Sequence, residues 1–316
     1  MEIVDFQESD VFMKKISAVL AMTAATVLWG LAFSAQSKGM EHVSALLFVA
    51  LRSIVGAAAL AAVIMFADAV RYRKCSFWGD VQSWDARQKI LSGGIFCGLI
   101  IAGASTFQQL GLLYVSAGKT GFLTALYIIM VPLLGILFRR KTNAVLYLAV
   151  LLALAGSYLL CGGIAAVKFG ELCVLICAFL FAVHILVIDR YASSCDCLRL
   201  SCLQFAVAAA ASAVISIILR EPWITHHIVE SLPFWIFCGI GSSAIAFTLQ
   251  IAAQKYLHPV TAALIMSLES VFAVLGGWLF LNERLSGKEA AGCLVILLAV
   301  ALAQIPVSDR KKSSIE

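Results

Sequence analysis

One acidic residue lies in the middle of a long apolar stretch and is the clearest candidate for chemistry. Glu269 stands within residues 259–281, which are mostly Ala, Leu, Ile, Met, Val and Phe, with no Lys or Arg one helical turn away. Burial without a basic partner disfavours the charged carboxylate, and ionisable residues at membrane depth are usually functional. We therefore expect Glu269 to take up a proton or a cation. The alternative is a structural hydrogen bond to a hydroxyl or an amide.

Other polar and aromatic residues also fall within apolar stretches. Gln108 and Gln250 either line a cavity or join two helices by hydrogen bonds, and Trp29 either forms a cavity wall or packs among apolar side chains. We expect Tyr127 to face the same cavity as Glu269 and to donate a hydrogen bond to a substrate. The full set of candidate cavity residues is Glu269, Tyr127, Gln108, Gln250, Trp29, Ser267 and His184.

Two basic residues stand where a positive charge is unfavourable. Arg52 lies within the apolar stretch 43–66. Pairing with backbone carbonyls or an acid is its favoured role, and anion binding is the alternative. Lys119 lies at an expected helix start, where a cation opposes the helix dipole. An anionic partner or substrate would explain Lys119, and a plain interfacial lysine is the simpler interpretation.

No pattern in the sequence indicates an enzyme or a bound cofactor. His184 and Asp189 are five residues apart, which on a helix separates their side chains by about 140°. They therefore cannot act together as a base and its orienting acid. The ten cysteines show no metal-binding spacing, and no glycine-rich phosphate loop is present. We expect no catalytic residue, no metal and no cofactor.

The composition places these residues in a membrane protein. Of the 316 residues, 62% are hydrophobic and 13% are charged, whereas soluble domains average about 25% charged residues. A spanning helix needs about 20 mostly apolar residues, and backbone amides in lipid must be bonded within their own segment, which favours helices. Ten spans are predicted, at residues 16–37, 43–66, 90–112, 119–138, 144–161, 169–188, 200–219, 233–256, 259–281 and 288–306.

Basic residues are unevenly distributed between the segments that join these spans. If the N-terminus is cytoplasmic, 16 of the 23 Lys and Arg residues fall in cytoplasmic segments and six in external ones. Cytoplasmic loops are the ones enriched in Lys and Arg, so the net charge of +5 indicates topology rather than a nucleic-acid surface. We expect a multi-pass plasma-membrane protein with both termini in the cytoplasm.

An internal repeat appears when the sequence is shifted by 142 residues. Residues 102–138 and 244–280 then share ten identities in 37 ungapped positions, including Thr, Gln and Tyr, which are scarce within the spans. A repeat of five spans turns the second unit upside down, as in many secondary transporters. The expected organisation is an all-α membrane protein of ten helices in two inverted five-helix repeats. Its parts are a cytoplasmic segment 1–15, repeats at 16–161 and 169–306, and a cytoplasmic tail 307–316.

Several motifs resemble the drug/metabolite transporter superfamily, in particular its EamA-type permeases. The first half carries Leu-Trp-Gly at 28–30 and YVSAGKTGF at 114–122. The second half carries SLESVF at 267–272 and GWLFLNERL at 277–285. The resemblance covers roughly residues 16–305. It implies a ten-helix fold whose substrate cavity is lined mainly by helices 1, 3, 4, 6, 8 and 9.

Two residues depart from the family's pattern. The usual proline after the glutamate is Ser270, so the sequence offers no proline to kink the ninth span at that point. The usual glycine before Glu283 is Asn282, which can still adopt a left-handed cap.

The spans, the repeat and the resemblance together predict a secondary active transporter that works by alternating access. The expected substrate is a small metabolite, an amino acid-like compound or an organic cation, with a proton as coupling ion and export favoured over import. The alternatives are a flippase-like protein for a lipid-linked head group and a membrane scaffold without transport. A cavity closed to lipid favours a transporter, a lateral opening favours a flippase, and a fully packed centre favours a scaffold.

The predicted orientation can be tested with Cys75 as the sole cysteine of an otherwise cysteine-free variant. Cys75 lies in a segment expected in the cytoplasm, so an impermeant thiol reagent should label it only after the membrane is opened. Labelling of Cys75 in intact cells would show that the topology is reversed.

Overall fold

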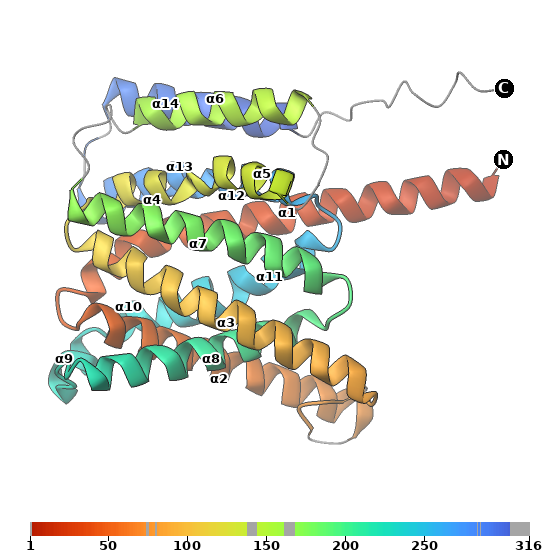
Figure 1. The fold of residues 1–316 in the computed structure, drawn as a ribbon, viewed down its shortest axis with the longest axis horizontal. Coiled ribbons are helices and arrows are strands. Elements are labelled where there is room, and N and C mark those ends of the chain that lie inside the picture. The colour runs from red at the N-terminus through yellow and green to blue at the C-terminus, as the bar shows by residue number, and fades with distance from the viewer. Residues whose placement is uncertain are drawn as a thin grey trace.

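The computed structural model describes residues 2–73, 76–79, 81–137, 144–160, 168–282, 284 and 286–303. Within this part of the chain the only regular elements are helices (Figure 1). The predicted C-terminal tail and Glu283 lie outside the described residues. The helices are α1 (Glu2–Gly39), α2 (Ala45–Tyr72), α3 (Trp84–Leu112), α4 (Ala117–Ala125), α5 (Tyr127–Leu137), α6 (Ala144–Leu160), α7 (Phe169–Ala192), α8 (Cys197–Ile218), α9 (Thr225–Glu230), α10 (Leu232–Phe237), the π-helix η1 (Cys238–Ala246), α11 (Phe247–Gln254), α12 (Pro259–Met266), α13 (Leu268–Leu281) and α14 (Gly287–Ala303).

Eight helical segments of the described chain are long and apolar enough to cross a membrane. The predicted spans 144–161 and 288–306 fall on α6 and α14, whose apolar parts, Tyr147–Gly156 and Ala290–Leu302, are shorter than the roughly 20 residues of a full span. The prediction of a helical, multi-pass membrane protein is confirmed. The count of ten spans in two inverted repeats stays a prediction.

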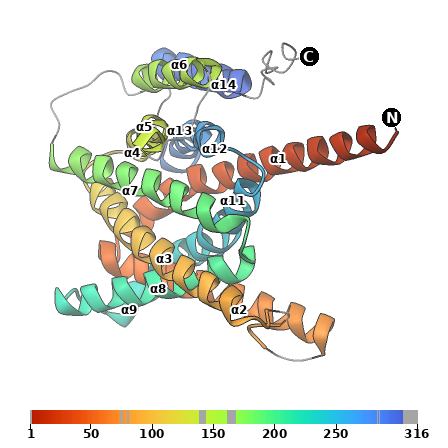
Figure 2. The ribbon, with the colours of Figure 1, turned by 45° about the vertical axis from the view of Figure 1, so that its right-hand side comes forward.

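The helices pack in pairs that join distant parts of the sequence. α6 packs against α14 at one edge of the bundle, and α2 packs against α8 at the opposite edge (Figures 1 and 2). Between these edges, α3 packs against α7, and α1 packs against α13. Each pair takes one helix from residues 16–161 and one from residues 169–306. The contact between the two predicted repeats therefore runs through the whole bundle.

Two of the spans are interrupted by a tightened turn. The first break separates α4 from α5 at Leu126, and the second separates α12 from α13 at Ser267. Backbone N–H groups there bond three residues back instead of four: Ile129 donates to Leu126 O at 3.0 Å, and Ser270 donates to Ser267 O at 3.1 Å. The Ser270 hydroxyl also donates to Ser267 O, at 2.7 Å. The ninth predicted span thus breaks without a proline, three residues before Ser270.

A third irregularity is the π-helical segment η1, which lies against α2. A Cβ added at Gly239 would lie 2.8 Å from the carbonyl oxygen of Arg52, and one at Gly56 would lie 2.8 Å from Cβ of Ser243. Glycine at both positions lets the two backbones approach closely. Wide π-turns of this kind are frequent at functional sites.

A buried ion pair joins the two halves at one end of the bundle. Arg199 of α8 contacts Asp68 of α2, with Nη2 and Oδ2 2.6 Å apart and both side chains 7% exposed. Arg199 Nε also donates to the carbonyl oxygen of Phe77, at 2.7 Å, in the segment that follows α2. Gly79, with φ of 42°, passes directly over the pair. The connection between α2 and α3 is thereby held against the N-terminus of α8.

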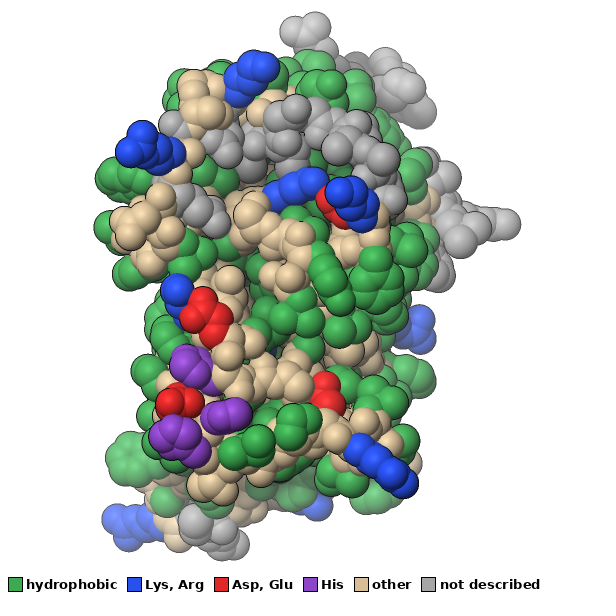
Figure 3. All heavy atoms as spheres, turned by 90° about the vertical axis from the view of Figure 1, so that its left-hand side faces the viewer, with side chains coloured by type: hydrophobic (Ala, Val, Ile, Leu, Met, Phe, Trp, Pro, Cys, Tyr) green, Lys and Arg blue, Asp and Glu red, His purple; other side chains and the backbone are tan. Residues whose placement is uncertain are grey.

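The opposite end of the bundle carries histidine and acidic side chains beside apolar ones (Figure 3). Glu230 of α9 contacts His42 at 3.5 Å and His226 at 3.1 Å. Glu221 accepts a hydrogen bond from the backbone N–H of Leu47 at 3.2 Å and so satisfies one free donor in the first turn of α2. This end is therefore held by exposed polar contacts, whereas the Asp68–Arg199 end is held by a buried one.

The tight crossing of α1 and α13 leads to a prediction about stability. A Cβ at Gly30 of α1 would overlap Cβ of Phe272 and lie 2.7–2.8 Å from the backbone of Phe272 and Ala273. Because backbone atoms cannot move aside cheaply, we expect Gly30→Ala to lower the free energy of unfolding by about 1–3 kcal/mol. Thermal unfolding of the purified protein in detergent measures the change.

Gly287→Ala is the matched control, because a Cβ at Gly287 meets nothing within 4 Å. Equal melting temperatures for the Gly30 and Gly287 variants would contradict the close crossing.

Candidate functional site

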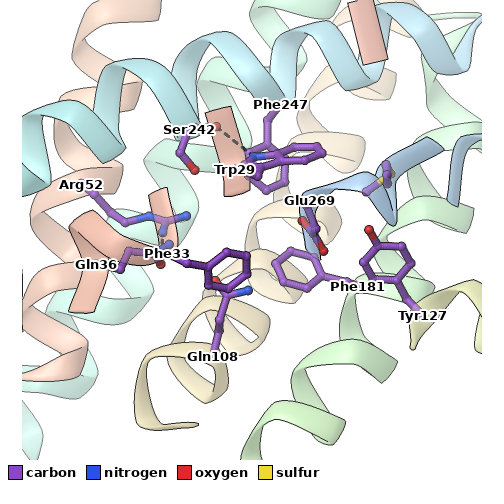
Figure 4. Close-up of a pocket in the computed structure, with 11 residues that line it drawn as sticks. Trp29, Phe33, Gln36, Arg52, Gln108, Tyr127, Phe181, Ser242, Phe247 and Glu269 are labelled. Atoms are coloured by element: carbon purple, nitrogen blue, oxygen red, sulfur yellow. Dashed lines mark hydrogen bonds between the residues drawn. The ribbon is translucent and has the colours of Figure 1, made fainter. Parts of the chain in front are cut away.

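A pocket with a cavity volume of about 30 Å³ lies among the helices of both halves (Figure 4). A volume of this size holds only about one or two water molecules and is well below the roughly 300–1,000 Å³ of small-molecule sites, so the pocket is nearly closed in this conformation. The lining comes from the six spans that the resemblance implies and, in addition, from α2. The lining residues are Trp29, Phe33, Gln36, Arg52, Gln108, Tyr127, Phe181, Ser242, Phe247, Met266 and Glu269.

The acidic part of the pocket is formed by Glu269 and Tyr127. Their exposed fractions are 5% and 1%, and Figure 4 shows both side chains directed to the same region of the pocket. Tyr127 is the first residue of α5 and Glu269 the second of α13, so each follows a helix break. The Tyr127 hydroxyl and the Glu269 carboxyl interact with each other, and neither Glu269 Oε1 nor the Tyr127 hydroxyl bonds to any other described residue. The acidic part of the pocket wall therefore holds a buried carboxyl whose nearest polar neighbour is a tyrosine hydroxyl.

The basic part of the pocket is formed by Arg52, which is 2% exposed. Its Nη1 donates to Gln36 Oε1 at 2.8 Å, and Gln109 Nε2 donates to the same oxygen at 2.6 Å. Its Nε has no partner among the described residues. Within that part of the chain no carboxylate forms an ion pair with Arg52. The sequence favoured a structural role for Arg52, and the structure places it on the pocket wall.

Aromatic rings form the walls of the pocket. The Trp29 and Phe247 rings meet edge to face with centroids 4.9 Å apart, and Phe181 stacks on Phe247 at 6.5 Å. Trp29 Nε1 donates to the carbonyl oxygen of Ser242, at 3.3 Å. Ser242 lies in η1, so the π-helix supplies the acceptor that orients the Trp29 ring. The Trp29 ring is thus both a cavity wall and a hydrogen-bonded part of the packing.

Three candidate cavity residues do not line this pocket. Gln250 is buried and donates to Gln254 Oε1, at 3.0 Å. Ser267 donates to Leu264 O, at 2.7 Å, within its own helix turn. His184 is fully buried, with Nε2 3.1 Å from Gln204 Oε1. Each of these side chains is held by a neighbour in the protein. The two glutamines of the repeat therefore differ, since Gln108 lines the pocket and Gln250 does not.

Lys119 has an acidic partner in the protein. Its Nζ lies 2.8 Å from Oε1 of Glu171. This ion pair joins the first turn of α4 to the first turn of α7. The sequence favoured a plain interfacial lysine. The anionic partner of the alternative interpretation is Glu171, a side chain of the other half, which the sequence did not identify.

Several lining residues were not among the candidates from the sequence. Gln36 and Ser242 are polar residues within apolar spans, the same signal that singled out Gln108. Phe181, Phe247 and Met266 carried no such signal, because apolar side chains are common throughout these spans.

Comparison with known proteins identifies the family to which the chain is similar. The model of the EamA-like transporter family matches the chain twice, at residues 16–162 and 168–304. An uncharacterized transporter from Archaeoglobus fulgidus is 25% identical over 297 residues, which is 93% of this chain and 88% of that protein. The uncharacterized transporter YoaV of Bacillus subtilis is 23% identical over 306 residues, 94% of this chain and 99% of that protein.

A solved structure described only as the crystal structure of a protein shares the fold. It has a TM-score of 0.68 and 24% identity, and the match covers 91% of this chain and 96% of that chain. The resemblance read from the motifs at 28–30, 114–122, 267–272 and 277–285 is confirmed by the double family match. The chain belongs to the EamA-like transporter family.

Proposed function

We propose that this chain is a secondary active transporter that carries a small polar metabolite through the pocket by alternating access, in the direction of export. The observation that carries the proposal is the buried pair Glu269 and Tyr127. Both side chains line the pocket, and Glu269 Oε1 and the Tyr127 hydroxyl bond to no described residue outside the pair. In a packed scaffold such atoms would be costly to leave unbonded. In a transporter they are the groups that a substrate or a proton satisfies.

Glu269 is the proposed coupling residue. A neutral, protonated carboxyl is tolerated in the empty pocket, because burial disfavours the charged form. A cationic group that enters the pocket stabilises the carboxylate instead, and the proton leaves to water. Because Glu269 holds either a proton or a cation, but not both, the transport of one is coupled to the transport of the other. Each is released only to the side of the membrane to which the pocket is open.

Alternating access is supported by the relation between the two halves. The helix breaks fall at nearly the same place in each half, and a shift of 142 residues relates Tyr127 to Glu269. The family model also matches each half separately. Inverted repeats of this kind allow one half to rock against the other around a fixed central site.

The proposed location is the plasma membrane, with both termini in the cytoplasm. α1 begins and α14 ends on the same side of the bundle (Figure 1), as an even number of spans requires. On this orientation the Asp68–Arg199 pair is cytoplasmic and the Glu230 cluster is external. A flippase for a lipid-linked head group remains the alternative, and a lateral opening of the pocket toward lipid would distinguish it.

The coupling role of Glu269 can be tested with Glu269→Gln, which keeps the shape and fixes the neutral form. Proteoliposomes with a pH-sensitive dye inside are challenged with pooled amino acids, amines and organic cations. We expect the wild-type protein to change the lumenal pH with at least one pool and Glu269→Gln to give no change.

The matched control is Glu230→Gln, which neutralises an exposed carboxylate distant in the sequence and should behave like the wild type. A Glu269→Gln variant that moves protons with substrate at the normal rate would show that the residue is structural.

A further inference from the structure

The described part of the chain buries two arginine side chains, and it neutralises only one of them with carboxylates. Arg199 has two acidic partners, with Asp68 Oδ2 at 2.6 Å and Asp196 Oδ1 at 3.4 Å from its guanidinium nitrogens. Arg52 is 2% exposed and donates from Nη1 to the amide oxygen of Gln36. No described carboxylate forms an ion pair with it. Arginine stays protonated in proteins, and buried charges are normally paired, so Arg52 calls for a counter-ion.

Glu269 is the acidic side chain of the pocket lining, and it does not supply that counter-charge. In Figure 4, Arg52 enters the pocket from the side of Gln36, whereas Glu269 enters it from the side of Tyr127 and Phe181. Arg52 and Glu269 do not form a salt bridge with each other. A carboxyl buried away from any basic partner is more stable in its neutral form. The pocket then carries the charge of Arg52 alone.

The Arg52 guanidinium meets the pocket together with other hydrogen-bond donors. Gln36 Oε1 accepts from Arg52 Nη1 and from Gln109 Nε2, which holds the guanidinium in one orientation. Arg52 Nε has no partner among the described residues. Gln108 and Ser242 line the same pocket, and an amide and a hydroxyl can each donate a hydrogen bond. A positive charge surrounded by donors is suited to an anion.

The size of the pocket limits this anion to a small one. The cavity volume is about 30 Å³, which is enough for about one or two water molecules. A chloride ion is only slightly larger than a water molecule and therefore fits. An organic acid brings a carbon body for which this conformation has no room. The closed pocket thus favours an inorganic ion over an organic one.

We propose that Arg52 binds a small monovalent inorganic anion, of the size of chloride, in the closed pocket. The anion supplies the counter-charge of the guanidinium and accepts a hydrogen bond from Arg52 Nε. Its place is separate from the carboxyl of Glu269, so the inference adds a second ligand to the proposed function and does not depend on transport. A ligand that binds only the folded protein stabilises it.

Thermal unfolding of the purified full-length protein measures this stabilisation. Sodium gluconate is replaced by sodium chloride at constant ionic strength, so that general screening of charges is the same in every sample. We expect a saturable rise of a few degrees in the melting temperature, because a ligand at ten times its Kd shifts the unfolding equilibrium by about elevenfold. Bromide should act like chloride. Methanesulfonate, a monovalent anion with a larger body, should act like gluconate.

Variants assign the effect to the pocket. Arg52→Gln removes the charge and should abolish the chloride-dependent shift, and Arg52→Lys retains the charge and should keep part of the shift. Glu269→Gln leaves the pocket without a carboxyl group and should keep the whole shift. Lys38→Gln is the matched control, because it removes an exposed cation paired with Glu41 and should respond to chloride as the wild-type protein does.

The inference is overturned if the wild-type protein melts at the same temperature in chloride and in gluconate, or if methanesulfonate stabilises it as much as chloride. Both outcomes are read on the wild-type protein and hold even if an Arg52 variant does not fold. A full chloride shift in a folded Arg52→Gln variant would place the anion elsewhere and would also overturn it. Proteoliposomes without a lumenal pH response would contradict only the proposed function, since no step of this test uses transport.

Discussion

A backbone amide at membrane depth has no water to bond, so every irregular turn in a membrane helix must find its partners within the protein. The pocket lies where this constraint is met in three unusual ways. The breaks at Leu126 and Ser267 are satisfied by backbone bonds to the residue three back, and the break at Ser267 also by two serine hydroxyls. The π-helix η1 gives one carbonyl to Trp29. Each departure from a regular helix thereby positions a side chain of the site.

The same constraint explains why the polar residues of the pocket lie where they do. Tyr127 and Glu269 immediately follow the two breaks, where the chain changes direction and a side chain can be aimed between helices. Arg52 reaches the pocket because Gly239 and Gly56 allow α2 and η1 to approach closely. Backbone geometry and the position of buried polar groups are therefore linked, because the breaks at Leu126 and Ser267 place Tyr127 and Glu269 in the pocket wall.

The sequence predicted the helical membrane fold and the most prominent polar residues, because a charge or an amide within an apolar span is conspicuous. Glu269 and Gln108 were identified on this ground, and both line the pocket together with the aromatic candidates Tyr127 and Trp29. The spans have little amphipathic character, so the sequence does not tell which face of a helix meets the cavity. For that reason Gln250 was not distinguished from Gln108, and the partnership of Lys119 with Glu171 was not foreseen. The short apolar helices α6 and α14 likewise leave the number of spans open.

The Asp68–Arg199 pair has a consequence for the proposed alternating access. Both side chains are buried from water while α2 and α8 are in contact. Separation of these helices would break the ion pair and expose both charges to water at the same time. Hydration of the separated ions offsets much of the attraction that is lost. Separation of the Asp68–Arg199 pair therefore costs little net free energy, but it requires the ion pair to break and both charges to be hydrated in one concerted step. A barrier of this kind would slow spontaneous opening of one side of the bundle without locking it, and a leak of protons or ions through a half-open state would be rare.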